Sequence, residues 1–259
     1  MKKKLLAGLV AVLSLVIANP VQADSAADLD ILQRAYPGAF EIVDNGQAIE
    51  FPNGRRLIYD DGREKSFDEL LEEPDLEDMM SLDYPLGEVF SPPGFQNDPG
   101  RFRPDPFFRG LYGETESDVR ANLRPVRWGP DGPWFQVTTR FGVADALVAV
   151  IAELWALPPE FLEYLLDPGG SFNYRTIAGT ERVSMHGFGI AVDIAVGPAN
   201  YWRWEPAGAS VYRNRVPYEI VEIFEAHGFI WGGKWYHFDT MHFEYRPELL
   251  LKAQARPAD

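Results

Sequence analysis

Alternating hydrophobic and polar positions predict two β-strands in the C-terminal half of the chain. The first runs from Ile190 to Ala195, with large apolar residues at every second position and Asp193 on the opposite side. The second lies within residues 239–245, where apolar residues alternate with polar ones that include His242 and Glu244. Because each strand turns its polar side chains away from its large apolar residues, we expect Asp193 and His242 to converge.

Other spacings of apolar residues predict helices and further strands. Segment 143–157 is apolar over most of its surface, which favours a buried helix rather than a membrane span. Ser66 and Glu69 have the spacing of a capping box that opens an acidic helix. The remaining expected elements are helices at 26–35, 117–123 and after Pro217, a hairpin of 48–51 and 56–59, and strands at 134–139 and 171–177.

Residues 84–112 break this regular pattern, because they are rich in proline and glycine with phenylalanines between them. A disordered linker would carry fewer aromatic residues, so we expect an irregular segment pressed onto the rest of the protein. The sequence therefore predicts an α+β protein. An N-terminal extension over residues 24–120 would wrap a C-terminal domain over residues 121–259.

The first 23 residues have the pattern of a secretory signal peptide. Three lysines at positions 2–4 precede an apolar run at 5–18, and Val21-Gln22-Ala23 resembles a cleavage site. The alternative is an uncleaved N-terminal anchor, although the apolar run is short for a span. With no cysteine in the chain, neither a disulfide framework nor a lipid-anchor site is expected. We expect an exported protein, periplasmic or extracellular, without a membrane span in its mature chain.

The formal net charge of −15 includes the three N-terminal lysines, so the mature chain is still more acidic. Such a protein should not bind nucleic acid or an anionic membrane nonspecifically. It also gains no long-range attraction for an anionic substrate, so any favourable field must be local. Residues 60–83 hold eleven acidic residues against Arg63 and Lys65, which is typical of a solvated face. The alternative is a patch that binds a cation or docks a partner.

Three side chains could share one metal ion. Gly187 and Gly189 suit a tight loop that carries His186 to the start of the strand holding Asp193, and His242 reaches the same face from the second strand. Two imidazoles and a carboxylate, with a fourth position left to water, are the ligand set of a catalytic zinc site rather than a closed structural one.

These residues resemble a known family. The matching motifs are Ser184-x-His186-x-x-Gly189-x-Ala191-x-Asp193, Gly228–Trp235 and Asp239-x-x-His242-Phe243-Glu244. Over about residues 172–248 the chain resembles the zinc D-alanyl-D-alanine carboxypeptidases and L-alanyl-D-glutamate endopeptidases, bacterial cell-wall enzymes. The resemblance implies their hedgehog/DD-peptidase fold, an antiparallel sheet with flanking helices. It also implies one Zn²⁺ per chain on His186, Asp193 and His242.

The resemblance also implies roles for residues around the metal. Asp239 occupies the position of the family's catalytic acid, which takes a proton from water and delivers it to the leaving amine. Arg175 fits the family's arginine upstream of the first zinc ligand, where it would bind a terminal carboxylate or polarise the scissile carbonyl. A surface salt bridge is the alternative for Arg175. If Asp239 instead caps a turn, the base is missing.

Other candidates carry weaker signals. His237 could stabilise the tetrahedral intermediate, or it could be an ordinary strand histidine. Ser184 and Glu244 are expected to orient the ligands through hydrogen bonds, the alternatives being loop capping and an exposed charge. Trp202 and Trp204 could line a substrate groove, and core packing is equally compatible with them.

The expected function is therefore zinc-dependent hydrolysis of peptidoglycan stem peptides by a metal-activated water. The enzyme would act as a D,D-carboxypeptidase or as an endopeptidase, and we expect a monomer. The alternative is a metal-holding cell-wall binding module without catalysis. The presence of Asp239 and Arg175 beside a complete ligand set favours the enzyme.

Overall fold

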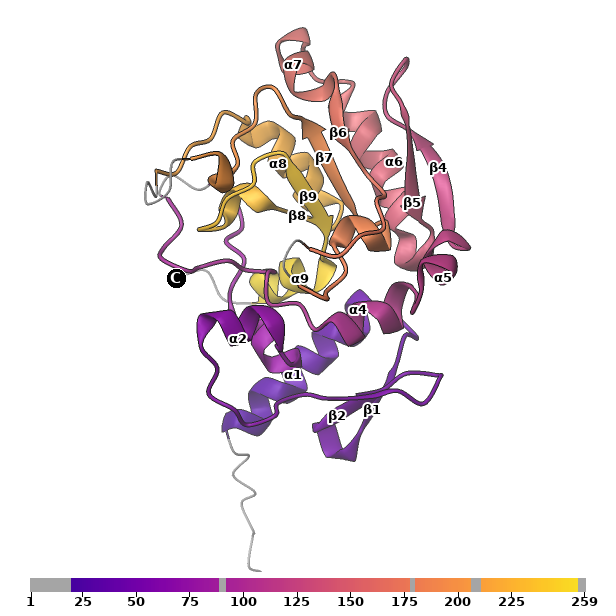
Figure 1. Ribbon diagram of the computed structural model, residues 1–259, viewed down its shortest axis with the longest axis vertical. Helices are drawn as coiled ribbons and strands as arrows, with labels where there is room; N and C mark the ends of the chain where they lie inside the picture. The colour runs from indigo at the N-terminus through magenta and orange to yellow at the C-terminus, as the bar shows by residue number, and fades with distance from the viewer. Residues whose placement is uncertain (1–19, 89–91, 178–179, 206–210, 256–259) are drawn as a thin grey trace, which may run out of the picture.

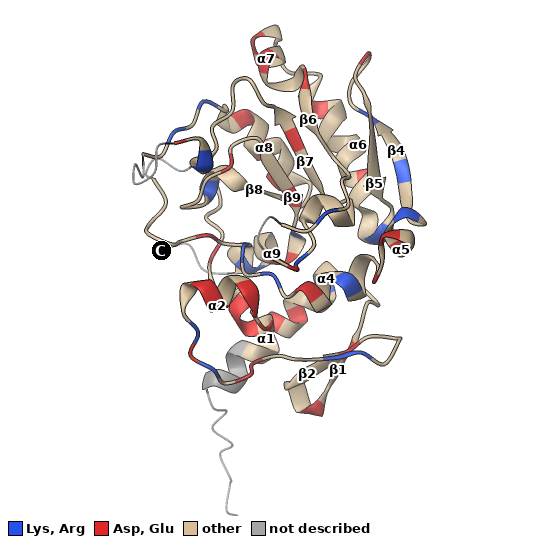
Figure 2. Ribbon diagram, viewed as in Figure 1, with Lys and Arg blue, Asp and Glu red and all other residues tan. Residues whose placement is uncertain are grey.

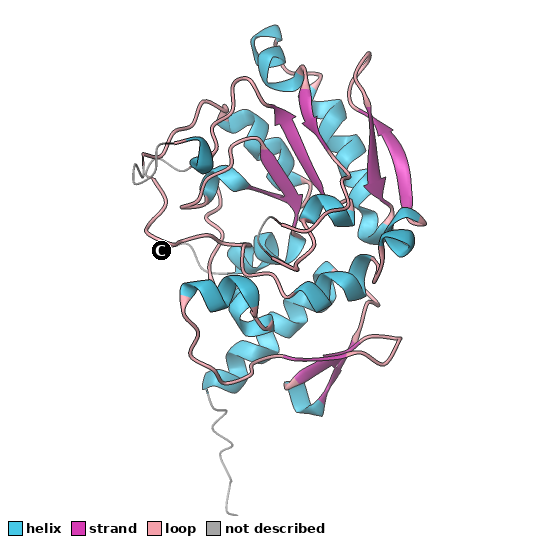
Figure 3. Cartoon of the chain, in the orientation of Figure 1, coloured by secondary structure: helices cyan, strands magenta, loops and turns pink. Residues whose placement is uncertain are grey.

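The computed structural model describes residues 20–88, 92–177, 180–205 and 211–255 (Figure 1). Most of the predicted signal peptide, residues 1–19, lies outside the described residues. The fold is α+β, as predicted, and every strand pair between the named strands is antiparallel (Figure 3). Within the described residues, no helix combines the length and the apolar character needed to cross a membrane.

The N-terminal region lies at the bottom of Figure 1. Its elements are α1 (Pro20–Ala35), β1 (Glu41–Val43), β2 (Ala48–Glu50), β3 (Arg56–Ile58), α2 (Phe67–Glu72) and α3 (Leu76–Ser81). The predicted hairpin is confirmed as β2–β3, and Gly54 in its turn has a φ of 82°, which favours glycine. The capping box is confirmed too, since Ser66 and Glu69 exchange hydrogen bonds at the start of α2.

The next part of the chain contains α4 (Asp105–Tyr112), α5 (Glu116–Arg120), β4 (Leu123–Arg127), β5 (Trp134–Thr138), α6 (Val143–Leu154) and α7 (Leu162–Leu165). The prediction of an irregular segment to residue 112 is wrong at its end, where α4 forms. Pro104 and Pro106 flank the first residue of α4, and proline is tolerated in a first turn. Four buried side chains then face the core: Phe107, Phe108, Leu111 and Tyr112.

A four-stranded sheet in the order β6-β7-β9-β8 forms the centre of the C-terminal region. Its strands are β6 (Pro168–Gly170), β7 (Ala191–Ala195), β9 (His242–Tyr245) and β8 (Phe229–Trp231), with helices α8 (Tyr218–Ala226) and α9 (Pro247–Ala255) beside them. In Figure 1, α6 and α8 lie behind this sheet. Phe224 of α8 stacks on Phe243 of β9 at 3.8 Å between ring centroids, so the apolar face of the sheet is covered. The polar face is left for Asp193 and His242.

The predicted strand at 171–177 is wrong. The strand beside β7 is β6, three residues earlier, and of the predicted segment only Thr176 makes a bridge, to Val183. Gly169 allows the close pairing, because a Cβ at this position would lie 2.8 Å from the Cβ of Asp193. Glycines weaken a strand pattern in the sequence, so Pro168–Gly170 gives no clear strand signal.

The N-terminal and C-terminal regions share one hydrophobic core. Buried residues from Leu29 to Leu250 form a single cluster, and the hydroxyl of Tyr36 at the end of α1 donates a 2.6 Å hydrogen bond to Glu248 of α9. The division of the chain near residue 120 stays a prediction. Because the core is continuous, the N-terminal extension is part of the folded unit that carries the site.

Candidate active site

Asp193 and His242 face one another across neighbouring strands. They are direct partners in the register of β7 and β9, so their side chains point to the same side of the sheet. Asp193 Oδ1 lies 3.0 Å from Nδ1 of His242. The convergence expected from the alternating pattern is therefore present in the structure.

His186 comes from a short 3-10 turn, Met185–Phe188, just before β7. Gly189 closes this turn with a φ of 70°, and a Cβ there would lie 2.7 Å from the Leu123 side chain. The turn holds Nε2 of His186 at 3.2 Å from Nδ1 of His242 and 3.3 Å from Oδ1 of Asp193. Three ligand atoms thus surround one point.

The geometry of these three atoms fits a tetrahedral zinc ion. Ligands at about 2.0–2.1 Å from zinc in tetrahedral directions lie about 3.3 Å from one another. The three observed separations are 3.0, 3.2 and 3.3 Å. The site therefore fits a zinc ion held by His186, Asp193 and His242, with further coordination positions for solvent or substrate.

Second hydrogen bonds orient both imidazoles. Nδ1 of His186 lies 2.6 Å from the carbonyl oxygen of Ser171, and Nε2 of His242 lies 3.0 Å from Oε2 of Glu244. If these nitrogens carry the protons, the opposite ring nitrogens present lone pairs to the shared point. Glu244 is fully buried, and Arg103 and Arg246 each donate to it at 3.0 Å. The alternative of an exposed charge at Glu244 is therefore wrong.

The electrostatics of the ligand set favour a cation. Burial opposes ionisation of Asp193, but the adjacent His186 and His242 hold its pKa well below the usual range. Burial also lowers the pKa of His242, yet its hydrogen bonds to Asp193 and Glu244 outweigh this and raise it to about 10. Two carboxylates around one imidazole thus attract positive charge, and a divalent ion meets the same demand.

Asp239 lies in the loop before β9, three residues from His242. A bridge to Tyr201 and a hydrogen bond from the His242 amide to its carbonyl oxygen hold the loop. Its carboxylate oxygen Oδ1 is buried without a hydrogen-bond partner among the described residues. Burial, with a contribution from Asp193, raises the pKa of Asp239 to about 6. A carboxylate with a raised pKa and a free acceptor can take up and release a proton near neutral pH.

A cavity of about 330 Å³ connects these groups. The ligands and Asp239 lie in its wall, and so do the arginines at positions 101, 103, 175 and 203. The chain as a whole is acidic, and acidic residues gather along α2 in Figure 2. The cavity nevertheless concentrates arginine, which provides the local field that the net charge does not.

Some of the other predicted residues line this cavity and some do not. Arg175 is exposed and lines the cavity, as does the buried Ser184. Within the described residues the Ser184 side chain neither caps its turn nor hydrogen-bonds to the ligands, so its orienting role stays a prediction. Trp202 and Trp204 are not in the cavity wall, whereas Tyr201 and Arg203 of the same loop are.

His237 lies beside the cavity rather than in its wall. Its Nδ1 lies 2.6 Å from the buried carboxylate of Asp98, which also accepts the His237 backbone amide at 2.8 Å. The ring packs against Phe67 and Trp202, with centroids 5.7 and 4.6 Å apart. A role for His237 in stabilising an intermediate stays a prediction.

The sequence analysis missed three residues that build the site: Asp98, Arg101 and Arg103. All three belong to the proline-rich segment before α4 and approach the sheet only in the tertiary structure. A cluster of arginines in an otherwise acidic chain was the available signal. Position in the sequence gave no indication of which arginines would meet at the cavity.

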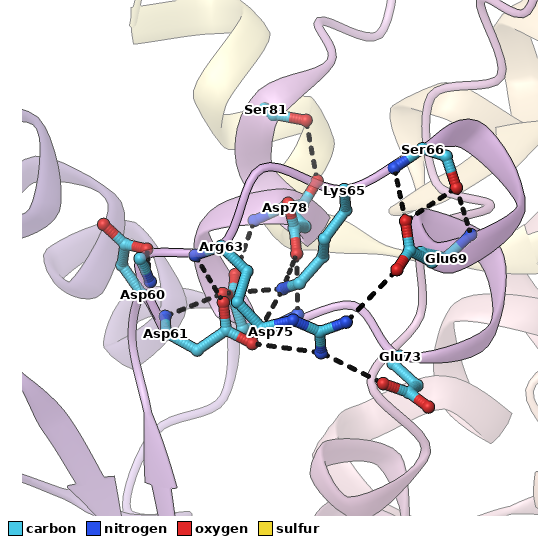
Figure 4. Close-up of polar contacts among 11 residues, drawn as sticks. Asp60, Asp61, Arg63, Lys65, Ser66, Glu69, Glu73, Asp75, Asp78 and Ser81 are labelled. Atoms are coloured by element: carbon cyan, nitrogen blue, oxygen red, sulfur yellow. Dashed lines mark hydrogen bonds and ion pairs between the residues drawn. The ribbon is translucent and has the colours of Figure 1, made fainter.

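The acidic run at 60–83 does not form a simple solvated face. Figure 4 shows its carboxylates gathered around Lys65, whose Nζ lies 3.1, 3.0 and 2.5 Å from Asp61, Asp75 and Asp78. Asp78 is buried, and the Lys65 side chain is fully buried. The prediction of a solvated face is wrong for Asp78, which is buried against Lys65, whereas most acidic residues of the run, including Asp61, are exposed as predicted.

Comparison with known proteins gives one match. Residues 178–245, about a quarter of the chain, match the model of a family described as D-alanyl-D-alanine carboxypeptidase. No curated protein and no solved structure gives a match. The matched residues contain all three candidate ligands together with Asp239. The segment that carries the candidate metal site therefore matches a family described as D-alanyl-D-alanine carboxypeptidase, in agreement with the resemblance of its motifs.

Proposed function

We propose that the protein is a zinc-dependent peptidase that hydrolyses peptide bonds in peptidoglycan stem peptides. One observation carries this proposal. A triangle of ligand atoms with edges of 3.0–3.3 Å lies in the same cavity as the unpartnered, buried carboxylate oxygen of Asp239. The match of this segment to a peptidase family supports the same reaction class.

In this proposal His186, Asp193 and His242 hold the zinc ion. Zinc, when bound there, supplies a Lewis acid that lowers the pKa of water and polarises a carbonyl oxygen. Asp239 accepts a proton from the attacking water at Oδ1 and then delivers it to the amine that leaves. Its raised pKa of about 6 suits a group that must both accept and donate this proton.

Arg175 binds the substrate in this proposal. Its guanidinium lines the cavity, and among the described residues it makes no ion pair with a carboxylate. A planar fork of donors suits the free carboxylate at the end of a stem peptide, which would position the last peptide bond over the metal. This arrangement favours a D,D-carboxypeptidase. An endopeptidase would use the same residue to polarise the scissile carbonyl.

We also propose that the C-terminal region has the hedgehog/DD-peptidase fold. The protein would be exported, would act in the periplasm or outside the cell, and would be a monomer. The antiparallel sheet with helix α8 packed on its apolar face supports the fold. A metal-holding binding module is the alternative function. The unsatisfied Asp239 carboxylate argues against it, because burying this group costs free energy that a binding role does not require.

Mass spectrometry of muropeptides incubated with the protein tests this proposal. Loss of a single alanine would identify a carboxypeptidase, and separated stem fragments would identify an endopeptidase. Either product should disappear when a zinc chelator is added and return with zinc. If no product depends on the metal, the binding module becomes the better description.

A further inference from the structure

Residues 97–103, which lie within the proline-rich region before α4, are tied to the loop that precedes β9. The carbonyl oxygens of Asn97 and Pro99 accept hydrogen bonds of 2.9 and 2.7 Å from the Tyr236 amide and the Trp235 indole. Asp98 accepts the amide of His237 at 2.8 Å. This segment lies outside the 178–245 match, so its contacts are a feature of this chain rather than of the matched motifs.

These anchors place two arginines in the cavity wall. Arg103 is mostly buried and donates to Glu244, which in turn accepts from His242, so the N-terminal extension supports a metal ligand. Arg101 donates to the carbonyl oxygen of His237 at 3.2 Å, and its guanidinium lies 5.4 Å from the Trp235 ring centroid. These contacts hold Arg101 at the cavity without neutralising its charge.

The arginines of the cavity have different partners. Arg103 is paired with Glu244, but Arg101, Arg175 and Arg203 make no ion pair with a carboxylate within the described residues. The chain has 39 acidic and 24 basic residues, so carboxylate partners are abundant. Leaving three cations unpaired around one cavity favours an anionic ligand that supplies the missing charge.

The positive charges of the three unpaired arginines all act on one side chain, that of Tyr201. Burial raises the pKa of Tyr201, and the charges of Arg203, Arg101 and Arg175 all oppose this shift. Tyr201 lines the same cavity and bridges to Asp239. A guanidinium has five donors, and Arg101 uses one of them on a backbone carbonyl. Its remaining donors are sufficient for a bidentate contact with a carboxylate.

We propose that Arg101 of the N-terminal extension, together with Arg203, forms a second carboxylate-binding subsite beside the one assigned to Arg175. The substrate is then an acidic peptide that carries a carboxylate in addition to the group bound by Arg175. This inference rests on the proposed function and specifies its substrate class. It also gives the extension a role, because the matched segment does not contain Arg101.

Paired peptides test the subsite. Each pair has the same sequence and the same free C-terminus, and differs in whether its internal acidic group is a carboxylate or the corresponding amide. The wild-type, zinc-loaded full chain should cleave the carboxylate peptide with a kcat/KM about 10- to 100-fold above that of the amide. Arg101→Gln and Arg203→Gln should each remove most of this preference, because each lowers kcat/KM for the carboxylate peptide far more than for the amide peptide.

Three comparisons make the result specific. Arg127→Gln, on the exposed edge of β4, is the matched control and should keep the full preference. Arg101→Lys should restore part of it, since charge returns without the planar fork. Arg203→Gln covers the case in which Arg101→Gln unfolds, because Arg203 is exposed and its described side-chain contact is with the Trp202 ring.

The outcomes also separate this inference from the proposed function. Absence of any chelator-sensitive cleavage by the wild-type protein would contradict the peptidase, and the subsite is then tested by binding of the two peptides, followed through tryptophan fluorescence. Equal cleavage or equal binding of the carboxylate and amide peptides would overturn the subsite. So would an equal loss on both peptides in Arg101→Gln and Arg203→Gln.

Discussion

Two clusters in this protein each bring three side chains close enough to contact one cation. They differ in whether a side chain of the protein supplies that cation. In the N-terminal region, Asp61, Asp75 and Asp78 surround the ammonium of Lys65 (Figure 4). In the C-terminal sheet, His186, Asp193 and His242 surround a point that no side chain occupies among the described residues.

The N-terminal cluster is complete within the chain. Burial alone would lower the pKa of Lys65, but hydrogen bonds to Asp78, Asp75 and Asp61 hold it well above the usual range. Arg63 adds further pairs with Glu69 and Glu73. Because these cations already meet the carboxylates, proximity of acidic groups does not by itself make a metal site.

The C-terminal cluster differs in donor type and in what surrounds it. Two of its three donors are imidazole nitrogens, each oriented by a hydrogen bond on its other nitrogen. Its cavity keeps three arginines and the Asp239 carboxylate without ion-pair partners among the described residues. What distinguishes the candidate site is therefore its unpaired charged side chains and its oriented imidazole lone pairs, rather than the number of its carboxylates.

The largest expected effect comes from removing a ligand. His242→Ala should abolish zinc binding, because two remaining donors hold zinc far more weakly than three. Metal analysis of the purified protein measures this directly. His227→Ala is the matched control, since His227 pairs with Glu153 and does not line the cavity, and it should keep one zinc per chain. Stoichiometric zinc in His242→Ala would refute the ligand assignment.

Next in size is the loss of the proposed base. Asp239→Asn should keep its zinc but lower kcat by about two to four orders of magnitude. Because the buried carboxylate lacks a hydrogen-bond partner at Oδ1 and its pKa is raised, the neutral amide should leave Tm unchanged or higher. Steady-state kinetics measure the change in kcat, and thermal unfolding measures the change in Tm. Asp145→Asn at an exposed pair serves as control, and full turnover in Asp239→Asn would exclude Asp239 from the reaction.

Removing the ammonium of Lys65 tests the N-terminal cluster, in which the chain supplies its own cation. Lys65→Met should lower the free energy of unfolding by about 3 kcal/mol, since Asp75 and Asp78 remain buried without their partner. Without the ammonium, which lowers the pKa of Asp78, this pKa should rise further in the folded variant, so the deficit should shrink as the pH falls from 7 towards 5. Urea unfolding at both pH values measures this.

The matched control for Lys65→Met is Arg34→Met, which breaks an exposed pair with Asp30 and should cost less than about 0.5 kcal/mol. Both variants should keep their zinc. If Lys65→Met unfolds like the wild type at pH 7, the ammonium is not what holds the carboxylates together. A loss of zinc from folded Lys65→Met would break the separation between the two clusters.

The smallest expected effect concerns an unpaired arginine of the cavity. Arg175→Ala should lower kcat/KM for peptides with a free C-terminus about 10-fold more than for internal bonds, because its proposed partner is the terminal carboxylate. Cleavage of a free-ended peptide and of its blocked analogue gives this ratio. Arg127→Ala should leave both rates unchanged. An equal loss on the two peptides would count against the terminal carboxylate as the partner.

The sequence by itself determined much of the candidate metal site. The period-two pattern put Asp193 and His242 on one face, since side chains alternate along a strand whatever surrounds it. The glycines around His186 indicated the tight turn, and Ser66 with Glu69 gave the helix start through a local exchange of hydrogen bonds. Local rules were sufficient here because the partners lie close in the chain or in one repeating pattern.

The tertiary structure decided which distant residues complete the candidate site and give its cavity a positive charge. Arg101 and Arg103 reach the cavity from a segment more than 70 residues before the first ligand, and no local pattern specifies that contact. The strand beside β7 was displaced to Pro168–Gly170, because only glycine lets the backbone approach Asp193 so closely. The sequence left open whether Glu244 orients a ligand or is an exposed charge. Burial decided for contact with His242, since charge pairing in the core depends on which distant arginines fold against it.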